Sequence, residues 1–293
     1  MIDQVYSPRV EPRSARHAVR GVDYHVSEWG HSDHPLLVLL HGWNDSGSSF
    51  QFLVDELPGD WFVVAPDWRG FGESRCRAEG YWFPDYVADL DVLLGIYSPQ
   101  DPVRLVGHSM GANVAGLYAG IMPERVAAFV NMEGFGLPES DPQNAPAHYR
   151  RWIERSRGAE PYSTYRDFGE LAERIRKRSP RMSEDKALFV AKLWAERLDD
   201  GTVALRADPA HRLPNAVQYR RAEARACWEK ITAPVLVVKG ADSDFYARAK
   251  EHAGPEEINT FAAAESVDVA DAGHMVHFEQ PAALAAVLEK FLR

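Results

Sequence analysis

Cysteines are scarce in this chain of 293 residues, which contains only Cys76 and Cys227. The two lie far apart and form no C-x-x-C motif, so they supply neither a disulfide framework nor a zinc site. We therefore expect two reduced, partly buried thiols. The first 21 residues contain four arginines and two prolines but no apolar segment, and we expect no secretory signal.

Long apolar runs and an excess of positive charge are also missing. The longest apolar run, Leu36–Leu40, is far shorter than the roughly 20 residues that cross a bilayer. The 33 Lys and Arg against 43 Asp and Glu give a net charge of −10, which should repel phosphate backbones and anionic membranes. We expect a cytoplasmic protein that binds no nucleic acid and no membrane, and that exists as a monomer or a homodimer.

Short apolar runs of strand length recur along the chain, each followed by a glycine or a turn. Continuous runs rich in Val and Leu are typical of strands that are covered on both faces of a parallel sheet. Between them, apolar residues have helical spacing, as in 86–96 and in the last twelve residues after Pro281. The alternation predicts an α/β fold. The expected strands are 36–40, 61–65, 103–106, 126–130, 235–238 and 267–270.

The alternation stops between about residues 138 and 228. Helical spacing is present there over 168–178 and 186–198, and the stretch contains 18 Lys and Arg against 14 Asp and Glu. It therefore carries +4, while the other residues together carry −14. Glycine and proline at both edges permit an insertion that leaves the sheet intact. We expect a core of residues 1–137 and 229–293 and a helical cap of residues 138–228.

A G-x-S-x-G motif, G-H-S-M-G over 107–111, directly follows one expected strand. Its glycines permit a tight turn that projects the hydroxyl of Ser109 above the sheet edge. A serine hydroxyl becomes a nucleophile when a base removes its proton and a third group orients that base. Ser109 is the candidate nucleophile, so a histidine and an acid are required.

The candidate base is His274, which follows Gly273 in the turn after the last expected strand. His277, three residues later, is expected to be a surface or packing histidine. An oxyanion needs preorganised N–H donors, and we expect them from the backbone of Trp43, after the first expected strand, and of Met110. Trp43 and His108 are also expected to contact the substrate.

Together these motifs resemble the α/β-hydrolases, in their serine hydrolase and esterase branch. The cap stretch, with P-Y-S-T-Y-R-D-F at 161–168, is more loosely similar to serine-hydrolase-like proteins. The resemblance covers nearly the whole chain and implies a mostly parallel sheet flanked by helices, with an inserted helical cap. It implies a structural role for the loop 67–74. The segments that carry it are H-G-W at 41–43, D-W-R-G-F-G-E-S at 67–74, G-H-S-M-G at 107–111, P-E-R-V at 123–126 and G-H at 273–274.

The identity of the acid is left open by this resemblance. Most of the family has an Asp three residues beyond the glycine that ends the strand after the cap, where this chain has Ser243 between Asp242 and Asp244. A one-residue shift in an extended segment turns a side chain to the opposite face. The other family position, used by haloalkane dehalogenases, corresponds to Glu133. We favour Glu133, with Asp244 or Asp242 as the alternative acid and a structural pairing with the cap as the alternative role of Glu133.

A serine nucleophile argues against dehalogenase or epoxide hydrolase activity, because those relatives use an aspartate. Ser109 and His274 support acyl transfer to water, for which no metal and no organic cofactor is needed. We expect a carboxylic ester hydrolase that acts on a small molecule. The alternatives are hydrolysis of a carbon-carbon bond, a lactone or an amide by the same residues, and a small-molecule sensor with little turnover. One further hypothesis is that cap arginines attract anionic acyl groups: Arg150, Arg151, Arg220 and Arg221.

Overall fold

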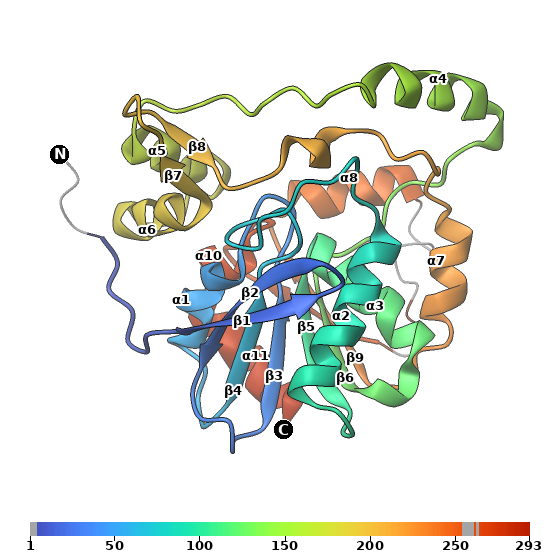
Figure 1. Cartoon of the computed structure of the whole chain (residues 1–293). Coiled ribbons are helices and arrows are strands. Elements are labelled where there is room, and N and C mark those ends of the chain that lie inside the picture. The colour runs from blue at the N-terminus through green and yellow to red at the C-terminus, as the bar shows by residue number, and fades with distance from the viewer. Residues whose placement is uncertain (1–4, 254–260, 262–263) are drawn as a thin grey trace.

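The computed structural model describes residues 5–253, 261 and 264–293, so residues 1–4 of the expected core lie outside the described residues. An eight-stranded sheet forms its centre, in the order β1-β2-β4-β3-β5-β6-β9-β10 (Figure 1). β2 is antiparallel to β1 and β4, and the other neighbours are parallel. The strands of this sheet are β1 (Arg13–Val19), β2 (Val22–Trp29), β3 (Leu36–Leu40), β4 (Phe62–Pro66), β5 (Val103–His108), β6 (Val126–Met132), β9 (Val235–Gly240) and β10 (Glu265–Val269).

The expected α/β class is confirmed. Every expected strand is present, with ends that differ from the expectation by at most two residues. β3 shows why these runs are continuously apolar. Its Leu37 and Leu39 pack into one hydrophobic cluster, and Val38 and Leu40 pack into another on the opposite face. Because both faces of such a strand are buried, its sequence does not alternate between apolar and polar residues.

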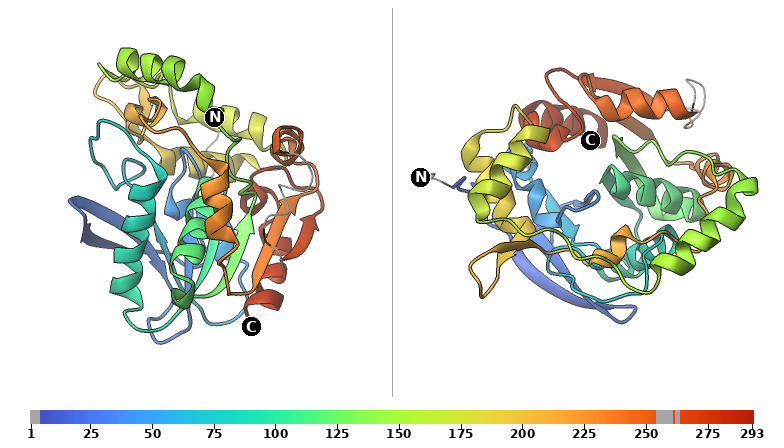
Figure 2. Two further views of the ribbon diagram at one scale, coloured as in Figure 1. Left: turned by 90° about the vertical axis from the view of Figure 1, so that its right-hand side faces the viewer. Right: turned by 90° about the horizontal axis from the view of Figure 1, so that it is seen from above.

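Helices cover both faces of the sheet (Figures 1 and 2). α2, α3 and α7 lie on one face, and α1, α10 and α11 lie on the other. Short 3₁₀ helices span Gly47–Phe50, Pro123–Arg125, Pro142–Asn144 and Pro209–Arg212. The α-helices are α1 (Gln51–Val54), α2 (Phe83–Tyr97), α3 (Met110–Ile121), α4 (Ala145–Arg155), α5 (Phe168–Arg178), α6 (Glu184–Trp194), α7 (Arg221–Trp228), α8 (Asp244–Ala253), α10 (Val276–Glu279) and α11 (Pro281–Leu292).

Small residues bring α3 and α7 into close contact. A Cβ on Gly120 of α3 would lie 1.9 Å from the backbone oxygen of Cys227, and one on Gly116 would lie 3.1 Å from the indole nitrogen of Trp228. α7 therefore packs against α3 beside the sheet. This helix lies within the range 138–228 that we expect to form the cap, so that range does not lie wholly above the sheet.

The rest of this range passes over the edge at which the parallel strands end (Figure 1). α5 and α6 share a hydrophobic cluster with Phe52 of α1 and Phe278 of α10. Two backbone hydrogen bonds add to this attachment: Gly72 N–H donates to the oxygen of Arg206, and Asp208 N–H donates to the oxygen of Gly70, both at 2.8 Å. The segment is thus held to the sheet layer by apolar packing and by main-chain pairing.

The helix expected over 186–198 is wrong at its C-terminal end. α6 ends at Trp194, and Ala195–Arg197 forms β7, which pairs antiparallel with β8 (Val203–Leu205). Between the two strands, Gly201 adopts a φ of 86°, and Asp200 Oδ1 accepts the N–H of Thr202 at 2.9 Å. This turn chemistry favours a hairpin over another helical turn, although the apolar spacing continues.

A hairpin that the sequence analysis does not predict forms one edge of the sheet. β1 and β2 are joined by Arg20 and Gly21, with φ values of 45° and 83°. Two residues with positive φ are typical of the tight hairpin turn whose twist matches that of the strands.

Two of the simpler expectations can be compared with the structure directly. Cys76 and Cys227 are free and half-buried, as expected. In the part of the chain that the structure describes, no helix combines the length and apolar character needed to traverse a bilayer.

Candidate active site

The residues predicted to carry the chemistry gather at one edge of the sheet. β3, β5, β6 and β9 are neighbouring parallel strands that end at this edge. Trp43 follows β3, Ser109 follows β5 and Glu133 follows β6. His274 lies between β10, which is parallel to β9, and α10. The topology thus brings together residues that are far apart in the sequence.

Ser109 occupies a strained turn between β5 and α3. Its φ of 51° and ψ of −114° lie in a region that residues other than glycine rarely adopt. The Ser109 N–H donates to the oxygen of Met132 at 2.8 Å, which fixes the turn to the neighbouring strand. On the other side, a Cβ on Gly111 would lie 2.2 Å from the backbone oxygen of Leu40. The chain therefore has the strand-turn-helix geometry that a G-x-S-x-G motif predicts.

A second tight turn positions Glu133 at the end of β6. The side chain of Asn131 clamps this turn, because its Nδ2 donates to the oxygen of Gly134 and its Oδ1 accepts the Gly134 N–H, both at 2.8 Å. Glu133 itself has a φ of 58°, and its N–H donates to the oxygen of Val238 on β9 at 3.1 Å. The carboxylate is consequently directed between the ends of β6 and β9.

The Glu133 carboxylate is fully buried and accepts three hydrogen bonds. Gly240 N–H donates to Oε1 at 2.8 Å, and Ser243 Oγ–H donates to Oε2 at 2.5 Å. His274 Nδ1 lies 3.0 Å from Oε2. Because a carboxylate oxygen accepts, Nδ1 carries the proton, and His274 Nε2 is left as the basic nitrogen.

The alternative acids lie elsewhere. Asp242 is exposed and forms an ion pair with Arg181, and Asp244 is exposed in the first turn of α8. Among the described residues, the carboxylate that contacts the His274 ring belongs to Glu133. Ser243 stands at the usual family position of the acid and contributes a hydroxyl to the acid at the other position.

Trp43 and Met110 flank the elbow. An ideal Cβ on Gly42, next to Trp43, would lie 3.2 Å from Ser109 Cβ, so the loop after β3 approaches the serine closely. Met110 is the first residue of α3, and N–H groups in the first helical turn have no acceptor within the helix. The Trp43 side chain is 46% exposed and packs edge-to-face on Phe71 and His211. It therefore has surface available for a ligand.

Comparison with known proteins agrees with this geometry. The profile of the family described as "alpha/beta hydrolase fold" matches residues 35–281. The chain belongs to this family.

Two relatives of this α/β-hydrolase have the word hydrolase in their names. It is 27% identical over 280 residues to a serine hydrolase-like protein of Danio rerio, covering 90% of this chain and 83% of the relative. It is 29% identical over 280 residues to a 3-hydroxybutyrate-oligomer hydrolase of Cupriavidus necator, covering 92% of each. Its fold is similar to the thioesterase domain from the curacin biosynthetic pathway, with a TM-score of 0.81, 23% identity, and coverage of 95% of this chain and 99% of that one.

His108 does not lie where a substrate-contacting residue would. The side chain of this histidine is 1% exposed, and its Nε2 lies 2.9 Å from the backbone oxygen of His274. Burial lowers the pKa of His108 well below its ordinary value, so the ring is neutral. The expected substrate contact is therefore corrected: this ring supports the His274 loop from below. Trp43 remains the exposed member of the pair.

Two buried residues that the sequence does not assign to the site, Asp45 and His277, lie close to His108. His277 is expected to be a surface or packing histidine, and its complete burial agrees with packing. Its ring centroid lies 4.5 Å from that of His108. Asp45 is also buried, with Oδ2 lying 3.7 Å from His277 Nε2. Burial lowers the pKa of His277. Although burial acts to raise the pKa of Asp45, contact with His277 holds it below its ordinary value.

One arginine of the proposed anion-attracting set also has a different position. Arg221 is buried, and its guanidinium donates to the backbone oxygens of Phe135 at 2.8 Å and Leu137 at 3.2 Å. It thus fastens α7 to the chain that leaves the Glu133 turn. Arg150, Arg151 and Arg220 are exposed.

Backbone strain is concentrated around these loops. Asn44 follows Trp43, and Asp271 stands three residues before His274. Together with Ser109 and Glu133, they are four of the five described residues other than glycine that have positive φ. Such conformations cost free energy and persist where the surrounding structure enforces them.

Proposed function

We propose that this α/β-hydrolase is a serine hydrolase of small-molecule carboxylic esters, with Ser109, His274 and Glu133 as its catalytic triad. The observation that carries the proposal is the pairing of His274 Nδ1 with the fully buried carboxylate of Glu133 at 3.0 Å. Glu133 follows β6, and Ser109 occupies a strained elbow at the end of the neighbouring strand β5. A nucleophile, a base and an orienting acid in that order are what acyl transfer requires.

The proposed reaction follows from the tautomer of His274. With Nδ1–H directed at Glu133, Nε2 takes the proton of Ser109 Oγ as the oxygen attacks the acyl carbon. The negative charge on the acyl oxygen is stabilised by the N–H groups of Trp43 and Met110. The same proton then passes to the leaving alcohol. Water, activated by His274, attacks the acyl-enzyme and restores Ser109.

The fixed position of Glu133 supports a role in catalysis rather than only in packing. Gly240 N–H and Ser243 Oγ–H occupy its remaining acceptor sites and hold the carboxylate in place, so that the histidine is oriented without further rearrangement. The negative carboxylate also stabilises the imidazolium that forms when His274 takes the proton.

For substrate class, we propose a neutral or hydroxylated short-chain ester. The oligomer hydrolase of Cupriavidus necator supports including a 3-hydroxybutyrate ester in the test panel. Lactone, amide and carbon-carbon substrates depend on the same residues, and a panel with one member of each class separates them from simple esters. We also propose that the protein is cytoplasmic. Its net charge of −10 supports action on small molecules rather than on nucleic acid or anionic membranes.

The experiment that tests the proposal is active-site labelling with a fluorophosphonate, combined with turnover of p-nitrophenyl acetate. We expect stoichiometric labelling of Ser109, and we expect S109A to abolish both labelling and turnover. Ser32, an exposed loop residue, provides the matched control, and S32A should behave as the wild type. A binding-only sensor would show little turnover and no acyl-enzyme. If Ser109 remains unlabelled, or if S109A retains full turnover, the proposed nucleophile is wrong.

A further inference from the structure

Next to His274, the proposed base, lies a buried cluster of potential metal ligands: Asp45, His108 and His277. One ligand atom from each of these residues can be chosen so that all three atoms lie within 4.8 Å of one another. The exposed fractions of the residues are 4%, 1% and 0%. Among the residues that the structure describes, Asp45 Oδ2, His108 Nδ1 and both ring nitrogens of His277 have no hydrogen-bond partner. Leaving such atoms unpaired inside a protein costs about 1–3 kcal/mol each. A bound species that satisfies them would therefore stabilise the cluster.

The orientation of His108 is that of a metal ligand. Its Nε2 lies 2.9 Å from the backbone oxygen of His274, and a carbonyl oxygen only accepts. Nε2 therefore carries the proton, and the free lone pair of the ring is left on the buried Nδ1, which has no partner among the described residues. Metal-bound histidines almost always donate their other ring N–H to a carbonyl or carboxylate in this way.

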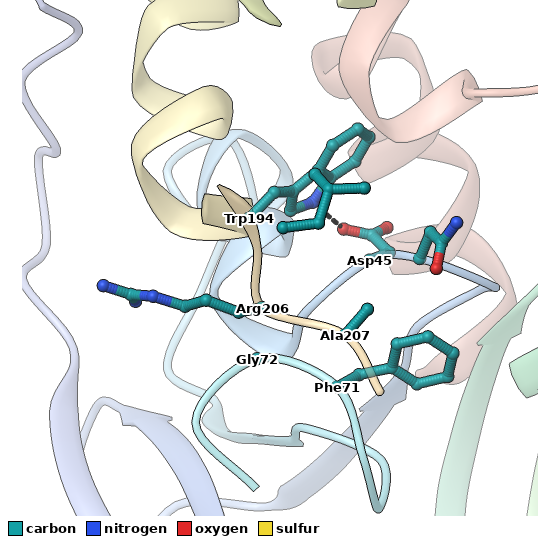
Figure 3. A pocket seen from close by; sticks show the side chains of 8 residues that line it. Asp45, Phe71, Gly72, Trp194, Arg206 and Ala207 are labelled. Atoms are coloured by element: carbon teal, nitrogen blue, oxygen red, sulfur yellow. Dashed lines mark hydrogen bonds between the residues drawn. The ribbon is translucent and has the colours of Figure 1, made fainter. Parts of the chain in front are cut away.

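Asp45 is oriented in a comparable manner. Its Oδ1 accepts the N–H of Ser46 at 2.8 Å and the indole N–H of Trp194 at 2.7 Å, which leaves Oδ2 for the cluster. Figure 3 shows the Trp194 bond from the side of a cavity of about 10 Å³, which Asp45 lines together with Phe71 and Ala207. A space of this size holds about one water molecule, so the Asp45 carboxylate lies beside room for a small occupant.

We propose that Asp45, His108 and His277 form a binding site for a single divalent transition-metal ion of the zinc class. Two imidazoles and a carboxylate suit such ions. Four-coordinate zinc places its ligand atoms about 3.4 Å apart, and the 3.7 Å between His277 Nε2 and Asp45 Oδ2 is already close to this value. No metal is expected from the sequence, because the three ligands come from separate segments and lack any ligand spacing.

The site is independent of the proposed hydrolysis, since none of its ligands takes part in acyl transfer. It is nevertheless joined to that chemistry through one bond. His108 would hold the metal through Nδ1 and the backbone of His274 through Nε2. Occupancy of the cluster would thus be transmitted directly to the loop that carries the proposed base.

The test is a titration of chelator-treated protein with Co²⁺ and Zn²⁺, read by the visible d–d absorption of bound Co²⁺ and by calorimetry. We expect one equivalent to bind to the wild type. D45N and H277F should each weaken binding by more than about 100-fold, and W194F, which removes a donor to the carboxylate, by about 10- to 100-fold. H31Q/H34Q removes a surface histidine pair with ring centroids 6.0 Å apart and should bind as the wild type does.

Thermal unfolding without metal shows which variants remain folded, and W194F keeps the test informative if a ligand variant does not fold. Two outcomes overturn the proposal. The first is the absence of saturable binding to the wild type, in which case buried water satisfies the cluster. The second is binding that persists in D45N and H277F or disappears in H31Q/H34Q, which would place the ion on the surface. Neither readout depends on ester hydrolysis, so failure of the proposed reaction leaves this test intact.

Discussion

Replacing Glu133 by Gln tests the orienting acid most sharply, because it changes the charge and the donor pattern while keeping the size of the side chain. The carboxylate accepts from Gly240 N–H, Ser243 Oγ–H and His274 Nδ1–H. An amide has only one oxygen for these three donors. If its NH₂ faces His274, Nδ1 must accept, and the proton moves to Nε2, where it blocks removal of the Ser109 proton. If its NH₂ faces Gly240, two N–H groups oppose each other.

The expected loss in kcat for E133Q is roughly ten-thousandfold, the effect of enforcing the wrong histidine tautomer in a serine triad. This corresponds to about 5 kcal/mol of activation free energy. The free energy of unfolding should fall by only about 2 kcal/mol, since a hydrogen bond to a charged group contributes roughly 1.5–3 kcal/mol. Catalysis should therefore suffer more than folding.

The assay is turnover of p-nitrophenyl acetate, with urea unfolding measured on the same samples. D244N is the matched control, because Asp244 is an exposed acid that directly follows Ser243 in the chain. The kcat of D244N should change less than twofold. A loss of less than tenfold in E133Q, or a larger loss in D244N than in E133Q, would refute the assignment of the acid. E133D, which keeps the charge on a shorter side chain, should recover part of the activity.

Three further predictions concern the surroundings of the site. S243A removes a donor to Glu133 and should lower kcat/KM roughly tenfold, which corresponds to about 1.4 kcal/mol of activation free energy. A larger loss in S243A than in E133Q would contradict the proposal that Ser243 acts through Glu133. Burial lowers the pKa of His211 to about 3, so between pH about 6.5 and about 3 the unfolded chain binds a proton that the folded chain does not. The free energy of unfolding should therefore fall as the pH falls through this window, by up to about 1.4 kcal/mol per pH unit. In H211Q, the free energy of unfolding measured with urea should depend less steeply on pH. G120A should destabilise the fold by about 1–3 kcal/mol, because the added Cβ clashes with α7. G95A is the control on α2, where a Cβ meets nothing within 4 Å, and it should stabilise the fold by about 0.5–1 kcal/mol. Equal melting temperatures for the two variants would argue against the close packing of α3 on α7.

The sheet could be predicted from sequence because its signals are local. Runs such as Leu36–Leu40 can be buried on both faces only in a covered sheet, and the strand-turn-helix around Ser109 follows from its flanking glycines. The end of α6 could not be predicted in this way, because the apolar spacing continues through Ala195 into β7. There, the turn formed by Asp200 and Gly201 outweighs the helical pattern.

The choice of the proposed acid depends on a contact between distant segments, His274 and Glu133. Ser243, where most relatives have an acid, indicates that the acid has moved, yet the sequence leaves Asp242, Asp244 and Glu133 as choices. The structure separates them by burial and by the Asn131 clamp on the turn after β6. The proximity of Asp45 and His277 could not be predicted from the sequence, because nothing in their spacing indicates that they come together.

The gathering of positive φ values at Asn44, Ser109, Glu133 and Asp271 also bears on engineering of this chain. Each of these residues holds its loop in a conformation that glycine would adopt at lower cost. Searches for thermostable variants will therefore tend to select glycine at these turns and to remove the side chains of Ser109 and Glu133, which the proposed reaction needs. Stabilisation is better sought in distant helices, with the strand ends left as they are.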